Sequence, residues 1–295
     1  MVRRFPAEAT RRTAITLASL VAVTTIGSAQ LAKPNAAGVA MGHLHYVVKD
    51  VEATRRFWLQ LGGSPIRVGS IEAVEFPEIL VLIERGAPSG TSDGAVVNHV
   101  AFRVPAFVAL EAKGVSVAPV QQFPGVGSVL SPEGERVELF ENAADNTWFK
   151  LDSGLRDATA DRHNHAVTAP IVPHHIHLYV PEGREADAKA WYVRAFGGVP
   201  GKRWRYDAAD LPGINLNFSA APKPVVPMKG RMLDHIGFEV DGLAAFCRKL
   251  EAAGIRLDAA YERPPDGFAR ARLTDPWGTN IELTEGLRAA ITRGR

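Results

Sequence analysis

The sequence contains a single cysteine in 295 residues, which excludes intrachain disulfides and any cysteine-rich metal site. That residue, Cys247, lies on a helical stripe with Leu243, Phe246 and Leu250, so we expect a buried thiol with a packing role. No apolar run reaches the roughly 20 residues that a membrane-spanning helix needs. Low-complexity tracts are also lacking, and 46% of the residues are apolar. The length therefore predicts two globular domains.

Residues 1–29 have the composition of a secretory signal. Four arginines precede an uncharged apolar run from Thr13 to Ile26, and the small residues at 27–29 suit a cleavage point. The pair Arg11 and Arg12 resembles a twin-arginine export signal. Loss of this segment removes four arginines and one glutamate and changes the formal net charge from +2 to −1. We therefore expect a soluble protein, periplasmic or secreted, without a basic surface for nucleic acid or membranes.

The rest of the chain repeats itself in two halves, and such self-similarity reveals the modular plan of a fold. Three pairs of segments carry the similarity: HLHYVVKD at 43–50 with HIHLYVPE at 175–182, NHVAFRV at 98–104 with DHIGFEV at 234–240, and SPEGERVELFE at 131–141 with DPWGTNIELTE at 275–285. Each half divides again into two units. Every unit opens with a histidine-led strand, continues with an amphipathic helix and closes with further strands.

Local signals support this division. Helices expected at 184–196 and 243–253 stop at Gly197 and Gly254, and glycine readily takes the left-handed conformation of a helix cap. Alternating runs such as 79–84 and 214–219 predict strands. The sequence thus predicts an α+β fold of four βαβββ modules. We expect a first domain at 40–142, a linker at 143–169 with a short helix near Trp148, a second domain at 170–286, and a C-terminal tail at 287–295.

The histidines occupy one face of the strands that open the modules. Because alternate side chains of a strand share a face, His43 and His45 point away from the apolar row that packs under the helices. The second half repeats this arrangement with His175, His177 and Tyr179. In the closing strands, Glu138 and Glu282 likewise oppose their apolar neighbours.

Four modules that open with histidine and close with D-P-x-G-x-x-x-E-L resemble the vicinal oxygen chelate superfamily, over residues 40 to 286. This superfamily includes glyoxalases, extradiol dioxygenases and bleomycin-resistance proteins. The resemblance implies two cupped mixed sheets, each built from two modules around a metal. It implies one ligand set of His175, His235 and Glu282, the main site, and a possible second set of His43, His99 and Glu138. Two imidazoles and one carboxylate suit Fe(II), Mn(II), Zn(II) or Ni(II).

Further residues are candidates for roles beside the metal. His177 shares the cup with His175 and has two interpretations: a proton shuttle or hydrogen-bond donor to the substrate, or a hydrogen-bond partner of Glu282. His163 and His165 lie in the expected linker, where we predict chance metal affinity or no role. Possible substrate contacts are Asn215, Asn217, Tyr179, Arg270 and Arg272, and arginines at 203 and 205 also lie where they can rim the second cup. Guanidinium groups favour an anionic ligand.

The resemblance implies a metal-dependent enzyme of glyoxalase type, with isomerase or lyase chemistry on a small vicinally oxygenated substrate. An Fe(II) extradiol dioxygenase is an alternative, but Arg272 replaces the tyrosine that dioxygenases carry three residues before the D-P pair. The glyoxalase pattern is also incomplete, because asparagines stand where a glutamate is expected. A metal-free ligand-binding or resistance protein is the third interpretation. Because four modules can form both cups within one chain, we expect a monomer.

Overall fold

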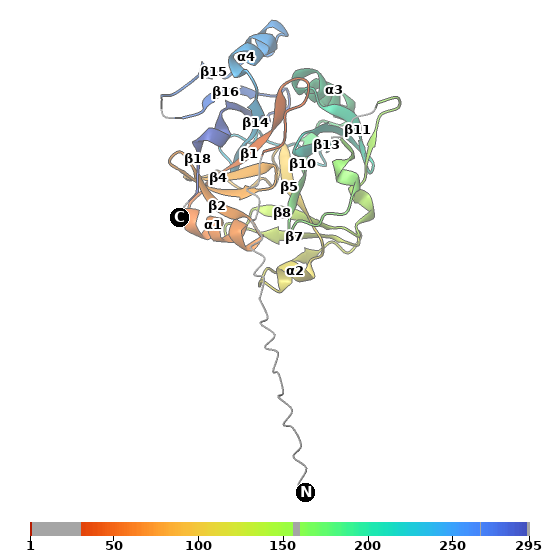
Figure 1. The fold of residues 1–295 in the computed structure, drawn as a ribbon. Coiled ribbons are helices and arrows are strands. Elements are labelled where there is room, and N and C mark those ends of the chain that lie inside the picture. Colours follow the sequence, from red (N-terminus) through yellow and green to blue (C-terminus); the bar gives the residue numbers. More distant parts are fainter. Residues whose placement is uncertain (2–30, 156–159, 266, 294–295) are drawn as a thin grey trace.

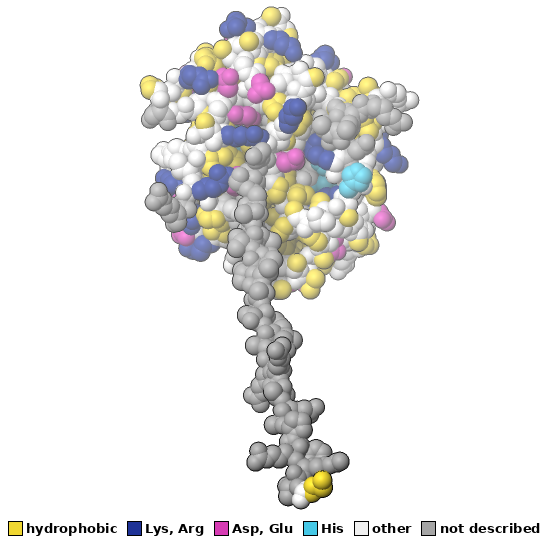
Figure 2. Space-filling model, in the orientation of Figure 1, with side chains coloured by type: hydrophobic (Ala, Val, Ile, Leu, Met, Phe, Trp, Pro, Cys, Tyr) yellow, Lys and Arg dark blue, Asp and Glu magenta, His cyan; other side chains and the backbone are white. Residues whose placement is uncertain are grey.

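A computed structural model describes Met1 and residues 31–155, 160–265 and 267–293 (Figure 1). The expected export signal therefore lies, except for Met1, outside the described residues. Among the helices of the described part, none is long and apolar enough to cross a membrane. On the face shown in Figure 2, basic and acidic side chains are interspersed.

Four βαβββ modules are present, as the sequence predicts, and the mixed α+β fold is confirmed. The first module consists of β1 (Val39–Val48), α1 (Val51–Gln60), β2 (Ser64–Val68), β3 (Ile71–Phe76) and β4 (Ile79–Arg85). The second consists of β5 (Val97–Val104), the short α2 (Val108–Glu111), β6 (Ala118–Pro119), β7 (Val126–Leu130) and β8 (Arg136–Glu141).

The second half repeats the same order of elements. The third module consists of β10 (Val172–Val180), α3 (Glu185–Phe196), β11 (Val199–Arg203), β12 (Tyr206–Leu211) and β13 (Ile214–Ala220). The fourth consists of β14 (Leu233–Val240), α4 (Leu243–Ala252), β15 (Ala259–Glu262), β16 (Ala269–Thr274) and β17 (Asn280–Glu285). Helix α3 ends at Gly197, whose φ of 71° is the left-handed cap that the sequence predicts.

The modules form two nine-stranded sheets, and each sheet takes one module from each half of the chain. The first sheet has the order β15-β16-β17-β14-β1-β4-β3-β2-β18 and joins modules one and four. The second has the order β6-β7-β8-β5-β10-β13-β12-β11-β9 and joins modules two and three. In Figure 1 the orange first module accordingly lies beside the blue fourth module. The expected domains at 40–142 and 170–286 follow the sequence halves and do not coincide with the sheets.

Antiparallel pairing of the opening strands joins the modules within each sheet. In the first sheet β1 pairs with β14, and His45 lies opposite His235. In the second sheet β10 pairs with β5, and His177 lies opposite His99. Side chains directly opposite on such a pair lie on the same face of the sheet. Histidines that are far apart in the sequence are thereby brought together.

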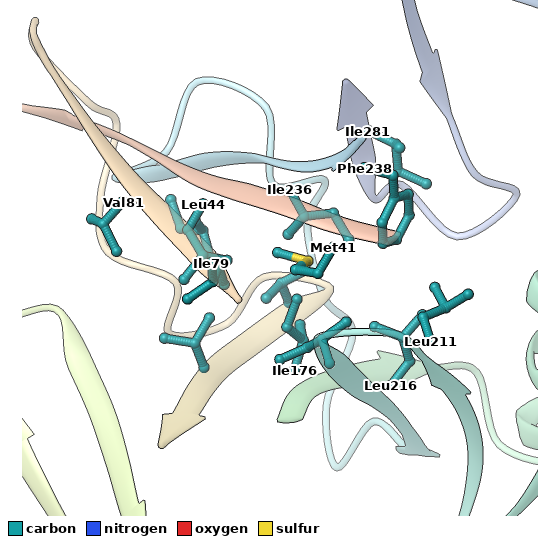
Figure 3. Packing of buried hydrophobic residues seen from close by; sticks show 14 of the residues in the cluster. Met41, Leu44, Ile79, Val81, Ile176, Leu211, Leu216, Ile236, Phe238 and Ile281 are labelled. Atoms are coloured by element: carbon teal, nitrogen blue, oxygen red, sulfur yellow. The ribbon is translucent and has the colours of Figure 1, made fainter. Parts of the chain in front are cut away.

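A single apolar core connects the two sheets. Figure 3 shows Met41 of β1 between Ile236 of β14 and Ile176 of β10, which belong to different sheets. Helix α3 packs on β12 and β13 of its own sheet. Its Phe196 also contacts Phe238 of the other sheet, with ring centroids 4.9 Å apart. The apolar rows predicted from alternation therefore pack against each other as well as against the helices.

The expected linker and tail are both part of the sheets. Strand β9 (Phe149–Leu151) lies in the expected linker and pairs with β11. The chain also forms 3₁₀ turns at Asp145–Thr147, just before Trp148, and at Ala160–Asn164. Beyond residue 286, Leu287 is fully buried, and β18 (Ile291–Thr292) pairs with β2. The described part of the expected C-terminal tail at 287–295 thus packs against the first sheet.

The shared core predicts that the two sheets unfold together. We expect Phe196→Ala to lower the free energy of unfolding by about 3–5 kcal/mol, because it leaves a cavity between the sheets. Val108→Ala is the control, since Val108 is 67% exposed and its loss should change stability by no more than about 0.5 kcal/mol. Urea unfolding followed by circular dichroism and tryptophan fluorescence tests this. Two separate transitions would contradict a common core.

Candidate metal centres

The first centre, which we define as His43, His45, His235 and Glu282, lies on the cup face of the first sheet. His43 comes from β1, His235 from β14 and Glu282 from β17. The Oε2 atom of Glu282 lies 3.3 Å from Nε2 of His43 and 3.5 Å from Nε2 of His235. Ligand atoms of the three histidines lie within 4.8 Å of one another. Two imidazoles and one carboxylate oxygen thus meet at one point.

Neighbouring groups orient these side chains. Nδ1 of His235 lies 2.7 Å from the Asp234 carboxylate, which fixes the ring and directs Nε2 toward Glu282. Nε of Arg272 donates a hydrogen bond of 3.0 Å to Oε1 of Glu282, and its Nη2 forms an ion pair with the same oxygen at 2.9 Å, so Oε2 faces the histidines. Burial raises the pKa of the Glu282 carboxyl, but bonds to His235 and His43 outweigh burial and hold it well below its usual range.

His43 is fully buried, and apart from the 3.3 Å contact of its Nε2 with Glu282, its ring nitrogens have no hydrogen-bond partner among the described residues. Nε2 of His235 is likewise buried, and its contact with Glu282 is at 3.5 Å, the limit of a hydrogen bond. Buried polar atoms normally find partners, and burial lowers the pKa of His43 and keeps its ring neutral. The neutral Nε2 of His43 beside a carboxylate oxygen fits a divalent cation. Gly237 makes room for this ring, because a Cβ there would lie 2.0 Å from Cε1 of His43.

His45 lies beside the other residues of the first centre, but its ring nitrogen Nε2 points toward Glu84. Its ring stacks on His235 at 4.4 Å between centroids, and its Nε2 lies 3.0 Å from Glu84. Burial and the neighbouring histidines hold the pKa of His45 well below its ordinary value. His43, His235 and Glu282 are therefore the better ligand set, with His45 packed against it.

The second centre, which we define as His99, Glu138, His175 and His177, occupies the equivalent place in the second sheet. The Oε2 atom of Glu138 lies 3.0 Å from Nε2 of His99 and 3.8 Å from Nε2 of His175. The three histidines again have ligand atoms within 4.8 Å of one another. Burial raises the pKa of Glu138, but the charges of His99 and Arg136 outweigh it and lower the pKa to about 2. His99, His175 and Glu138 therefore also fit a divalent cation.

A buried hydrogen-bond chain lies behind His175. His174 connects to it through Nδ1 of both rings, 2.9 Å apart, and receives a hydrogen bond of 2.8 Å from Nη1 of Arg203 at its Nε2. Simple alternation would place His174 in the apolar row, but the register of β10 shifts between Pro173 and His175. Such an irregularity turns a side chain toward the other face. His174 therefore supports the centre from behind.

His177 lies beside this centre. Its Nε2 is 2.7 Å from Oγ of Ser219, and its ring contacts Tyr206. Burial and the charge of His99 lower the pKa of His177 to about 3, so the ring is neutral near pH 7. Glu282 lies in the other sheet, so the hypothesis that His177 is its hydrogen-bond partner is wrong.

The two cups differ in what fills them. Strand register makes Leu80 and Leu82 the counterparts of Asn215 and Asn217, because the first pair lies beside His43 and His45 and the second beside His175 and His177. The leucines belong to an apolar cluster that covers the first cup. Its members are Leu31, Ile66, Val68, Ala73, Leu80, Leu82 and Leu287, with Phe268 and Ile291 packed against them.

The second cup is hollow. A cavity of about 210 Å³ is lined by all four residues of the second centre, and a neighbouring hollow of about 600 Å³ shares His177, Tyr179 and Tyr206 with it. Polar and aromatic side chains complete the smaller cavity. They include Arg136, Arg203 and Asn217 together with Phe123, Trp204 and Tyr206. A small molecule can therefore reach the second centre, whereas apolar side chains cover the first cup.

The expected ligand sets were paired wrongly. His235 and Glu282 lie with His43 instead of His175, and His99 and Glu138 lie with His175 instead of His43. The reason is the pairing of modules across the two halves, which alternation within a strand does not reveal.

The expected substrate residues also divide between the cups. Tyr179 and Asn217 line the cavity, but Asn215 is bonded to Asp210 and Arg203. Arg270 and Arg272 belong to the first sheet, where they bond Glu262 and Glu282 and lie away from the cavity. Of the pair expected to have no role, His163 is buried and lies 2.7 Å from Asp210, while His165 is exposed.

Sequence reasoning missed His45, His174 and Arg136 as members of these sites. Alternation could have selected His45, since it shares a strand face with His43. Alternation also places Arg136 on the strand face of Glu138, which it contacts together with Asn98. Periodicity could not have found His174, because a register shift in β10 turns its side chain.

Comparison with known proteins agrees with this architecture. Residues 172–283 match the family model described as Glyoxalase/Bleomycin resistance protein/Dioxygenase superfamily. No curated protein matches the chain. Glyoxalase I from Zea mays is similar in structure, with a TM-score of 0.60 at 15% identity, covering 85% of this chain and 95% of that one.

A second similar structure is a putative dioxygenase from Bacillus subtilis subsp. subtilis str. 168. Its TM-score is 0.55 at 15% identity, and the match covers 87% of this chain and 86% of that one. At such identities the likeness concerns the fold alone. Residues 172–283 therefore match the model of the Glyoxalase/Bleomycin resistance protein/Dioxygenase superfamily, and the chain as a whole shares the two-domain fold of these two structures.

Proposed function

We propose that the chain is a divalent-metal enzyme of glyoxalase type, with isomerase or lyase chemistry on a small vicinally oxygenated substrate at the second centre. The observation that carries the proposal is the cavity of about 210 Å³ lined by His99, Glu138, His175 and His177. The first centre would hold its ion under an apolar cover and serve stability. Export to the periplasm or medium belongs to the proposal and rests on the composition of residues 1–29.

The ligands of the second centre would be His99, His175 and Glu138. A divalent ion there supplies Lewis-acid polarisation of substrate oxygens. Arg136 lies 3.4 Å from Oε1 of Glu138 and draws that oxygen away from the histidines. His177 stands outside this ligand set but lines the same cavity. Because its ring is neutral near pH 7, it can accept a proton from a bound substrate or donate a hydrogen bond to it.

Two other functions use parts of the same site. An Fe(II) dioxygenase needs the same type of ligand set, so the chemistry of the ligands does not separate it from a glyoxalase-type enzyme. A ligand-binding protein without metal would need the cavity but not two imidazoles aimed at one carboxylate oxygen. Metal analysis decides between an enzyme of either type and a binder. Activity screening with 2-oxoaldehydes, 2-hydroxyacids and catechols after anaerobic metal loading then separates the enzymes.

The first prediction concerns metal stoichiometry. We expect the wild type to bind two divalent ions per chain. The single variants His43→Ala and His99→Ala should each bind one ion and the double variant none, because the two histidines serve different centres. Plasma mass spectrometry of the purified protein measures this, with Arg270→Met as a matched surface control that keeps both ions. If the double variant retained one ion, His43 and His99 would share a centre after all. A metal-free wild type after reconstitution would refute the enzyme proposal.

The second prediction concerns His177. His177→Ala should keep both ions while kcat falls by about 10²–10⁴-fold, the usual contribution of a positioned acid or base. His45→Ala is the matched control in the other cup and should leave kcat unchanged. The measurement is turnover of the substrate found by screening, together with metal content. Full turnover in His177→Ala would exclude the proton role.

The third prediction concerns stability in acid. Burial lowers the pKa of six histidines: His43, His45, His163, His174, His175 and His177. As the pH falls below 6.5, these histidines take up protons in the unfolded chain but stay neutral in the folded protein. The free energy of unfolding therefore decreases as the pH decreases. Each such histidine contributes up to about 1.4 kcal/mol per pH unit. The raised pKa of His235 acts in the opposite direction.

Urea unfolding of metal-free protein at pH 7, 6 and 5 measures this effect. We expect a steady fall in the unfolding free energy between pH 7 and 5, and a smaller fall in His174→Asn, which removes one buried imidazole. Equal stability at pH 7 and 5 would contradict the burial of these rings in the neutral form.

A further inference from the structure

Arg203 is a buried cation with one donor group left over. Only 2% of its surface is exposed, and its Nε and Nη1 donate to Asn215 and His174. Its Nη2 is buried and has no hydrogen-bond partner among the described residues. Burial lowers the pKa of Arg203 to about 9. The charge of Asp210 counters part of this shift, but a buried donor normally finds a hydrogen-bond partner, and Arg203 lines the cavity of the second centre.

Asn217 lines the same cavity with its whole amide unsatisfied. The residue is 1% exposed, and neither Nδ2 nor Oδ1 has a hydrogen-bond partner among the described residues. It lies beside His177 on the neighbouring strand. In the first cup, the counterparts of Asn217 and Arg203 are Leu82 and Val68, since strand register relates them pairwise. Unpartnered donors therefore mark the hollow cup, while apolar side chains occupy the same places in the filled one.

Trp204 forms an aromatic side of the cavity, and its backbone is strained. It has a φ of 51°, in the left-handed region, where its counterpart in the first sheet is Gly69 with a φ of 57°. A bulky side chain in this region is strained, and strain of this kind is typical of functional sites. Trp204 lines the cavity and contacts Phe123 and Tyr206 at 5.2 and 5.5 Å between centroids. A planar group can stack against these rings.

From these observations we propose that the second centre takes a small aromatic carboxylate. Nη2 of Arg203 and the amide of Asn217 bind the carboxylate beside the histidines, and the aromatic ring lies against Trp204. This assignment rests on the proposed function for the location of the site and names the class of its substrate. The carboxylate accepts hydrogen bonds from both buried donors, Nη2 of Arg203 and Nδ2 of Asn217, and brings a negative charge to the guanidinium, which a neutral ligand of the same shape does not.

Calorimetric titration of the signal-processed, metal-loaded protein with mandelate, its neutral analogue mandelamide and the ring-free analogue lactate tests this. We expect mandelate to bind about tenfold or more tightly than either analogue, since a hydrogen bond to a charged group and a stacked ring each contribute that much. Asn217→Leu introduces the residue found at position 82 and should abolish the preference over mandelamide. Arg203→Lys should do the same, and Arg270→Met is the matched arginine control that should not.

Trp204→Gly separates binding from structure. Because glycine relieves the strain, thermal stability should stay equal or rise, while the preference for mandelate over lactate disappears. Equal binding of mandelate and mandelamide by the wild type, or no binding of either, would overturn the assignment. Metal content is measured on the same samples. A carboxylate preference in a chain that holds no metal would support the assignment and count against the proposed enzyme.

Discussion

Pairing of the opening strands across the two halves of the chain determines the rest of the structure. Backbone hydrogen bonds between β1 and β14, and between β5 and β10, place histidines of different modules on one face of each sheet. The closing strands β17 and β8 then lie parallel to β14 and β5 and bring Glu282 and Glu138 to the same points. Neither half of the chain contains a complete set of ligands. The metal centres are therefore properties of the sheets and not of the repeats.

The two equivalent cups differ in their interiors: the first is filled by apolar side chains, and the second contains a cavity with polar lining. In the first, leucine and valine side chains fill the space beside the histidines, so that buried apolar contacts surround the site. In the second, asparagine and arginine take the same positions and leave a cavity with unpartnered donors. Filling a cup gains free energy from apolar burial, at roughly 25 cal/mol per Å². Keeping one open sacrifices part of that gain in return for access to a ligand.

Much of this architecture can be predicted from the sequence, because it depends on local periodicity. The internal repeat predicts four modules, and the two-residue alternation predicts that His43, His99, His175, His235 and the two glutamates face away from the apolar rows. Both expectations agree with the structure.

The remaining features depend on the path of the chain in space. Module pairing is decided by how the strands cross between sheets, so the expected pairing of His175 with His235 is wrong, because they lie in different cups. The fates of Asn215 and Asn217 differ because Asp210 and Arg203 reach the first and not the second. The position of His174 depends on a register shift in β10. None of these leaves a periodic signal, since each arises from contacts between distant residues.

The cross-half pairing also has a consequence for biosynthesis. Strand β1 is complete by residue 48, but its neighbour β14 begins at residue 233. During synthesis the edge of β1 that pairs with β14 stays unpaired until most of the polypeptide has emerged. An unpaired edge of this kind can associate with other chains. Slow folding is expected of such distant pairings. A nascent chain of this protein therefore depends on chaperones or on rapid completion to protect that edge.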